Sequence, residues 1–199
     1  MDIAIRSYDK KIHNIQLTGE VNEGMFTKLA EAFDSILKSD NEIDINNQQA
    51  MNNLQIEYVP KHPDINIYLS SFGGNVYDML SIYDMIRRIQ HSYVVNLYCY
   101  GKVMSAATII MLAVDKEHRF AALNTTFMIH TLSSLNFGKI KELEENVEET
   151  KRLHNIIWSI YKDNTTIPDD KLNDVYEKKQ DWFFDSFDAK LNGLITDIV

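Results

Sequence analysis

The sequence predicts an α/β fold with a largely parallel sheet, and three observations carry that prediction. Strand-like segments alternate with amphipathic helical patterns along the chain, as in right-handed β-α-β units. Polar or flexible residues end three of the strand patterns, and in parallel sheets such ends gather at one edge, where sites form. The length of 199 residues favours one domain, residues 1–199, that can bury a sizeable core.

The N-terminal part predicts a strand, a helix and a long loop. A short strand is expected over residues 13–19, and EGMFTKLAEAFDSILKS over residues 23–39 has apolar residues at helical spacing. Residues 39–64 are polar, rich in Asn and Asp, and contain Pro60 and Pro63. We interpret them as a long loop with a short extended piece at LQIEYV; a loop of this length in a compact domain is usually functional or mobile.

The middle of the chain predicts further strands and helices. Strands are expected over residues 64–71 and 92–100, helices over 76–89 and from Ser105, and an extended segment over 119–130 that ends in a strand. The segment SYVVNLYCY alternates little between apolar and polar residues, which indicates a strand buried on both faces.

The C-terminal part predicts the longest helix, KIKELEENVEETKRLHNIIWSIY. Its less polar stripe includes Ile140, Val147, Leu153 and either Tyr161 or Ile160, while its glutamates form a solvated face. Another helix is expected after Pro168, whose missing N–H is tolerated in a first turn. A final helix is expected to end near Gly193, followed by a strand in LITDIV.

Charge and composition exclude several classes of partner. The formal net charge of −9 argues against a nucleic-acid binder and against docking on an anionic membrane. The single cysteine, Cys99, has no partner for an intramolecular disulfide, so we expect a buried thiol in a reducing compartment. No signal peptide and no apolar run of membrane-spanning length is found. These features predict a cytoplasmic protein.

Several motifs are absent. The sequence contains no HExxH and no His/Cys cluster with zinc spacing, so no metal site is expected. It contains no GxxxxGK[ST] and no GxGxxG, so neither ATP hydrolysis nor a nucleotide cofactor is predicted. The nucleophile elbow GxSxG of α/β-hydrolases is also missing.

The groups that serine catalysis requires are nevertheless present. That chemistry needs a hydroxyl, a histidine to take its proton, a carboxylate to hold the histidine, and backbone N–H donors for the oxyanion. The chain offers Ser105, His130, an acid in KKQDWFFD, and the Gly73–Gly74 pair. Each feature alone is more often structural: a small residue in a tight place, a core histidine, a helix cap or a turn.

The order of these features resembles the Clp protease proteolytic-subunit (ClpP) family of S14 serine peptidases. The resemblance is carried by YLSSFGGNVYDMLSIYDMIRRI, YGKVMSAATIIMLAV, RFAALNTTFMIHTL and DWFFDSFDAKLNGLITDIV, with LTGEVNEGM near the start. It runs from about residue 13 to 199, apart from most of 39–63. It implies a ClpP/crotonase-like ββα (βαβ) superhelix with a protruding handle helix over about 133–162.

The resemblance also implies roles for individual residues. Ser105 corresponds to the nucleophile and His130 to the general base. Asp181, twelve residues before Gly193, corresponds to the orienting acid, and Asp185 is the alternative because a small insertion would shift the register.

Three further residues correspond to the substrate-binding positions of the family. The backbone N–H groups of Gly74 and Ala106 match its oxyanion hole, and Gly73 keeps the end of the strand flat for a substrate strand. The implied partners are polypeptide substrates, identical subunits in two stacked seven-membered rings, and a separate AAA+ ATPase that unfolds substrates. The implied activity is that of a serine endopeptidase without a cofactor.

Other functions remain open on sequence alone. An inactive ring subunit would keep the scaffold, and the exchange of residue sizes at Met104 and Ala106 is its best support. An acyl-CoA enzyme of the crotonase fold would not need the Ser105–His130 pair, which disfavours it. A plain protein-binding module would not need the ordered catalytic residues.

Overall fold

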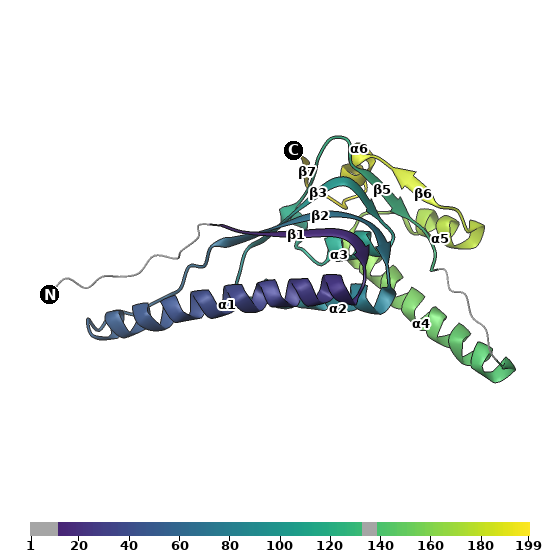
Figure 1. The fold of residues 1–199 in the computed structure, drawn as a ribbon. Coiled ribbons are helices and arrows are strands. Elements are labelled where there is room, and N and C mark those ends of the chain that lie inside the picture. Colours follow the sequence, from purple (N-terminus) through teal and green to yellow (C-terminus); the bar gives the residue numbers. More distant parts are fainter. Residues whose placement is uncertain (1–11, 133–138) are drawn as a thin grey trace.

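A computed structural model describes residues 12–132 and 139–199 (Figure 1). The strands are β1 (Ile12–Val21), β2 (Asp64–Gly74), β3 (Val95–Met104), β4 (Arg119–Ala121), β5 (Thr126–Ile129), β6 (Trp182–Phe184) and β7 (Asp197–Ile198). The helices are α1 (Glu23–Asn52), α2 (Val76–Ile89), α3 (Ala106–Leu112), α4 (Ile140–Asn164), α5 (Asp169–Lys178) and α6 (Ser186–Leu191), with a 3₁₀ turn at Lys116–His118.

The sheet is parallel except at one strand pair. Its order is β1-β2-β3-β4-β7, and every neighbouring pair in this path is parallel. The first half of β3 pairs with β4, and its last three residues pair with β5. Among the strands of the described residues, β6 alone runs antiparallel, alongside β5. The predicted, largely parallel sheet is confirmed, whereas β6 was not anticipated as a strand.

The core lies between the sheet and the helices α1, α2 and α3, which lie on the same side of it in Figure 1. Alternate residues of β2 and β3 point into this core, among them Ile67, Leu69, Leu97 and Cys99, all fully buried. Burying an aliphatic side chain of this size contributes roughly 1.5–3 kcal/mol.

The prediction that the segment containing β3 is buried on both faces is wrong. Tyr98 is only half-buried on the other face and Tyr100 is exposed. Tyrosine combines an apolar ring with a polar hydroxyl, so it counts as apolar in a sequence pattern while its tip remains in water.

Residues 39–52 are helical, which corrects the long loop predicted over 39–64. Helix α1 continues to Asn52, and LQIEYV belongs to no strand. The buried stripe of α1 continues at helical spacing, but Asp40 and Asn47 occupy two of its positions. Because these two residues are polar, the hydrophobic periodicity that marks the first half of the helix is lost in the second half.

Partners from distant segments make that polar stripe stable. Oδ2 of Asp40 accepts a hydrogen bond from the Tyr93 hydroxyl over 3.0 Å and lies 3.2 Å from Nε2 of His13. Nδ2 of Asn47 donates to the Tyr58 hydroxyl over 3.3 Å. A buried carboxylate without such partners would be costly, so these contacts hold the second half of α1 to the end of the sheet.

Helix α4 matches the handle predicted over about 133–162, as far as the structure describes it. Residues 133–138 lie outside the described residues. Figure 1 shows α4 pointing away from the sheet, with its C-terminal half against the body of the molecule. Its buried residues, Leu153, Ile157, Trp158 and Tyr161, all belong to that half.

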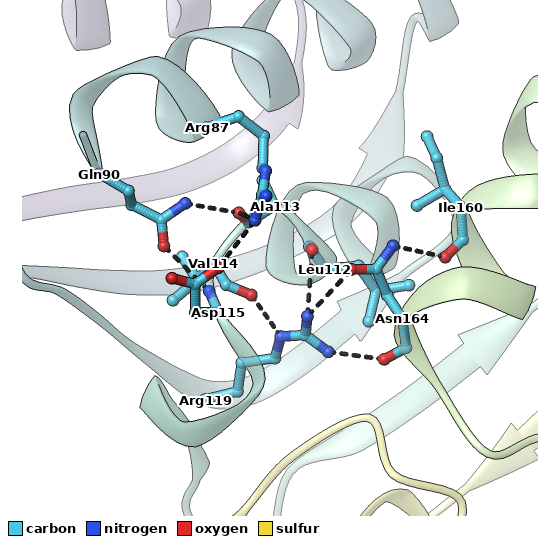
Figure 2. A network of polar contacts seen from close by, with 9 residues as sticks. All are labelled: Arg87, Gln90, Leu112, Ala113, Val114, Asp115, Arg119, Ile160 and Asn164. Atoms are coloured by element: carbon cyan, nitrogen blue, oxygen red, sulfur yellow. Dashed lines mark hydrogen bonds and ion pairs between the residues drawn. The ribbon is translucent and has the colours of Figure 1, made fainter.

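A buried arginine fixes the C-terminal ends of α3 and α4 to each other (Figure 2). The Arg119 guanidinium donates to the carbonyl oxygens of Leu112 at the end of α3, of Val114 two residues later, and of Asn164 at the end of α4. Burial lowers the pKa of Arg119 to about 10, so the cation persists at neutral pH. Its charge suits these helix ends, where unpaired carbonyls concentrate negative partial charge.

Within the part of the chain that the structure describes, no helix is both long and apolar enough to cross a membrane.

Candidate active site

Ser105 occupies a strained turn between β3 and α3. Its backbone has φ 54° and ψ −126°, an uncommon conformation for a residue with a side chain. Such a conformation costs about 1–3 kcal/mol and persists only where the surroundings impose it. Here the Ser105 N–H donates to the carbonyl of Met128 over 2.8 Å, and its own carbonyl accepts the N–H of Thr108 over 2.9 Å.

His130 lies beside Ser105 because their strands are neighbours. Met104 at the end of β3 pairs with Met128 of β5, and His130 follows directly after β5. Nε2 of His130 is 2.7 Å from Oγ of Ser105, a hydrogen-bonding distance. The histidine side chain is partly buried, with 27% of its surface exposed. The two residues whose pairing the sequence could not establish are therefore in direct contact.

The unanticipated strand β6 brings Asp181 to the same place. Trp182 pairs with Ile129 in antiparallel register, so Asp181, one residue earlier, lies opposite His130, one residue later. Oδ1 of Asp181 is 3.8 Å from Nδ1 of His130, longer than a hydrogen bond. A carboxylate on this side favours the tautomer with hydrogen on Nδ1, which leaves Nε2 free to accept from Ser105.

Asp185 has a different local role. Its carboxylate accepts the backbone N–H of Asp188 over 2.9 Å and caps the N-terminus of α6. Of the two acids that the sequence left open, Asp181 is the one that faces His130.

The two predicted glycines have different neighbours. A Cβ on Gly73 would lie 2.7 Å from Cβ of Ser105 and 3.0 Å from the backbone nitrogen of Ala106, so this glycine allows the strand to pass against the nucleophile turn. A Cβ on Gly74 would lie 2.2 Å from the carbonyl oxygen of Val21 in β1. The N–H of Gly73 already donates to Oγ of Ser71. Ala106 is the first residue of α3, so its N–H has no partner within that helix.

An apolar pocket opens beside Ser105 and His130. Its wall is formed mainly by Met79, Ile109, Leu132, Ile157, Trp158 and Tyr161. The last three belong to α4, so the handle contributes to the site as well as protruding from the molecule.

Sequence reasoning missed two contributors to this site. The aromatic run of β6, Trp182–Phe184, is short, and its strand character depends on pairing with β5, although three successive aromatic residues are a recognisable β signal. The stripe on α4 was recognised as apolar, but periodicity alone does not say which element it faces.

The chain is similar to known proteins in both sequence and structure. The sequence model of a family described as "Clp protease" matches residues 16–199. A curated relative, the "ATP-dependent Clp protease proteolytic subunit" of Deinococcus radiodurans, is 32% identical over 136 residues, which cover 68% of this chain and 65% of the relative. The match thus spans slightly less than two thirds of that relative's length.

A solved structure of a ClpP1 mutant from Listeria monocytogenes superposes with a TM-score of 0.73. The sequences are 23% identical, and the superposition covers 94% of this chain and 91% of that chain. At this identity the likeness concerns the fold alone, and it confirms the fold class predicted from the sequence.

Proposed function

Because the chain belongs to the Clp protease family, as its sequence motifs predicted, we propose that it is a serine endopeptidase subunit that cleaves unfolded polypeptides. The observation that carries the proposal is the 2.7 Å contact between Oγ of Ser105 and Nε2 of His130, at a strained strand–helix turn beside an apolar pocket. A serine that serves only packing does not require a histidine at hydrogen-bonding distance.

In the proposed reaction, Oγ of Ser105 attacks the carbonyl carbon of a peptide bond while its proton passes to Nε2 of His130. The negative charge that develops on the carbonyl oxygen faces the backbone N–H groups of Gly74 and Ala106. The C–N bond then breaks, and His130 returns the proton to the departing amine. Water, activated by the same histidine, hydrolyses the acyl-enzyme.

Asp181 is proposed to orient His130 and to stabilise the imidazolium that forms. The 3.8 Å between Oδ1 of Asp181 and Nδ1 of His130 becomes a hydrogen-bonding distance if the exposed carboxylate moves by about an ångström. Catalytic hydrogen bonds are often long in the absence of substrate. The apolar side chains that line the pocket are proposed to contact an uncharged part of the substrate next to the cleaved bond.

The proposed partners follow from the family. Identical subunits would form two stacked seven-membered rings that enclose the sites, and a separate AAA+ ATPase would deliver unfolded substrates. The sequence contains no nucleotide-binding loop, which agrees with unfolding by a separate protein.

The proposal is tested by incubating the protein with a serine-directed fluorophosphonate and measuring its intact mass. We expect one phosphonyl adduct in the wild type, none in Ser105→Ala, and loss of peptide hydrolysis in the same variant. Ser81→Ala is the matched control, since Ser81 is an exposed serine of α2 whose hydroxyl donates to the carbonyl of Tyr77 in the same helix.

Peptide hydrolysis that survives in Ser105→Ala would refute the assignment of the nucleophile. A wild type that forms no adduct and hydrolyses no peptide, alone or with an ATPase, would instead favour an inactive ring subunit.

A further inference from the structure

The backbone carbonyl of Ser105 accepts two hydrogen bonds from the same residue. Besides its backbone N–H, Thr108 presents its hydroxyl to this oxygen, over 2.6 Å. A carbonyl oxygen only accepts, so the single hydroxyl hydrogen of Thr108 is directed at Ser105. The oxygen of Thr108 remains available as an acceptor.

Tyr161 of α4 supplies a donor for that oxygen. Its phenol oxygen lies 2.5 Å from Oγ1 of Thr108, and both side chains are buried. Because the Thr108 hydrogen is engaged by Ser105, the hydrogen between the two hydroxyls belongs to Tyr161. Burial raises the pKa of Tyr161, so the phenol stays a neutral donor at neutral pH.

These contacts form a directed chain of hydrogen bonds from α4 to the nucleophile turn. The α4 end of this chain of hydrogen bonds is fixed in place. Asn164, three residues after Tyr161, accepts a hydrogen bond from the buried Arg119, which also holds the end of α3 (Figure 2). On its other side, the Ser105 N–H is held by Met128 of β5. Both ends of the Ser105 backbone are therefore anchored, one by β5 and one by α4 through Thr108.

We propose that Tyr161 is a positioning residue for Ser105, acting through the hydroxyl of Thr108. The inference rests on the proposed function, since it presupposes that Ser105 reacts. A positive φ at a residue with a side chain relaxes unless the surroundings hold it. Without the Tyr161 hydroxyl, the Thr108 hydroxyl is no longer fixed, and the turn spends less time with Oγ directed at His130.

The test is the second-order rate constant for phosphonylation of Ser105. We expect Tyr161→Phe and Thr108→Val each to lower it by roughly tenfold, about the effect of one buried hydrogen bond. Thr108→Ser, which keeps the hydroxyl, should retain a rate close to the wild type. The Tyr161→Phe, Thr108→Val double variant should be no slower than the slower single variant, because both remove the same chain of bonds.

The matched control is Tyr93→Phe. It removes another buried tyrosine hydroxyl, which donates to Asp40. Tyr93 precedes β3, whereas Ser105 follows the other end of that strand, so the two residues lie at opposite ends of it. We expect Tyr93→Phe to react at the wild-type rate.

Three outcomes would overturn the positioning role and leave the proposed function standing. They are a Tyr161→Phe rate equal to that of the wild type, a loss of rate in Tyr93→Phe as large as in Tyr161→Phe, and additive losses in the double variant. If Tyr161→Phe does not fold, the contrast between Thr108→Val and Thr108→Ser decides the same question. A wild type whose Ser105 takes up no phosphonyl group and that hydrolyses no peptide, alone or with an ATPase, overturns the proposed function and, with it, this inference.

Discussion

At the scale of single residues, the site depends on one close approach between two chain segments. Gly73 lies so close to the Ser105 turn that even a methyl group would overlap Cβ of Ser105 and, at 2.8 Å, the carbonyl oxygen of Met104. Gly73 also has a φ of +98°, which disfavours any side chain. The glycine is therefore required by backbone conformation and by space together.

Gly73→Ala is expected to lower the phosphonylation rate of Ser105 by more than about a hundredfold and stability by about 2–3 kcal/mol, because strain and overlap add. Gly19→Ala is the control that separates the two causes. Gly19 has the same φ of +98° but no atom within 4 Å of an added Cβ. Labelling rates and urea unfolding of both variants measure the difference; similar labelling losses in both would contradict the role of close approach.

The two candidate acids are distinguished by their contacts. Asp181→Asn is expected to slow labelling by about tenfold to a hundredfold, less than for a fully buried triad acid, since 55% of its side chain is exposed. Asp185→Asn should react like the wild type, because asparagine also caps helices well. A larger loss in Asp185→Asn than in Asp181→Asn would reverse the assignment.

At the scale of secondary-structure elements, the second half of α1 is held by a polar cluster at its side. His62 lies in the segment that returns from α1 to β2. Its Nδ1 is 3.0 Å from the carbonyl oxygen of Ser92 and its Nε2 is 2.8 Å from Oδ2 of Asp44. Both partners are hydrogen-bond acceptors, so both ring nitrogens donate. The ring is therefore the positively charged imidazolium, with a hydrogen on each nitrogen. Burial lowers the pKa of His62, but the bonds to Asp44 and Ser92 outweigh it and the net pKa is raised.

This raised pKa predicts a stability that depends on pH. The protonated His62 stabilises the folded state fully below about pH 6.5, the ordinary histidine value, and this contribution is lost as the pH rises through the higher pKa of the folded state. We expect the melting temperature difference between the wild type and His62→Gln to be larger at pH 6 than at pH 9. His91→Gln, at an exposed position, serves as the control. A difference that grows with pH would contradict the assigned proton.

At the scale of the whole molecule, half of the handle stripe is exposed among the residues that the structure describes. The C-terminal half of the α4 stripe is buried against the body, but Ile140 is 79% exposed and Val147 is 49% exposed. Exposed apolar residues at regular helical spacing favour packing against another helix. In the ring assembly proposed above, we expect this half of α4 to contact a second copy of the chain.

Ile140→Lys combined with Val147→Lys is therefore expected to lower the mass of the assembly in sedimentation experiments, because two charges would be buried at the contact. The control is Glu145→Lys combined with Asn146→Lys. It also introduces two lysines, at other exposed positions of the same half of α4, and should leave the mass of the assembly unchanged. An unchanged mass in the first variant would refute this contact.

Features that depend on local pattern could be predicted from the amino-acid sequence. Strand–helix alternation predicted the parallel sheet, helical spacing predicted α2 and the stripe of α4, and the order of Ser105, His130 and an acid before Gly193 predicted the family. These signals are short-range or ordered along the chain, so a single sequence contains them in full.

Features that depend on partners from distant segments become visible only in the folded molecule. Helix α1 extends to Asn52 because His13 and Tyr93 satisfy the buried Asp40, and no local pattern contains that pairing. Asp181 faces His130 because β6 pairs with β5, and Tyr161 reaches Ser105 through Thr108 because α4 packs on α3. The physical reason is the same each time: a buried polar group is stable only with its partner, and the fold determines which partner that is.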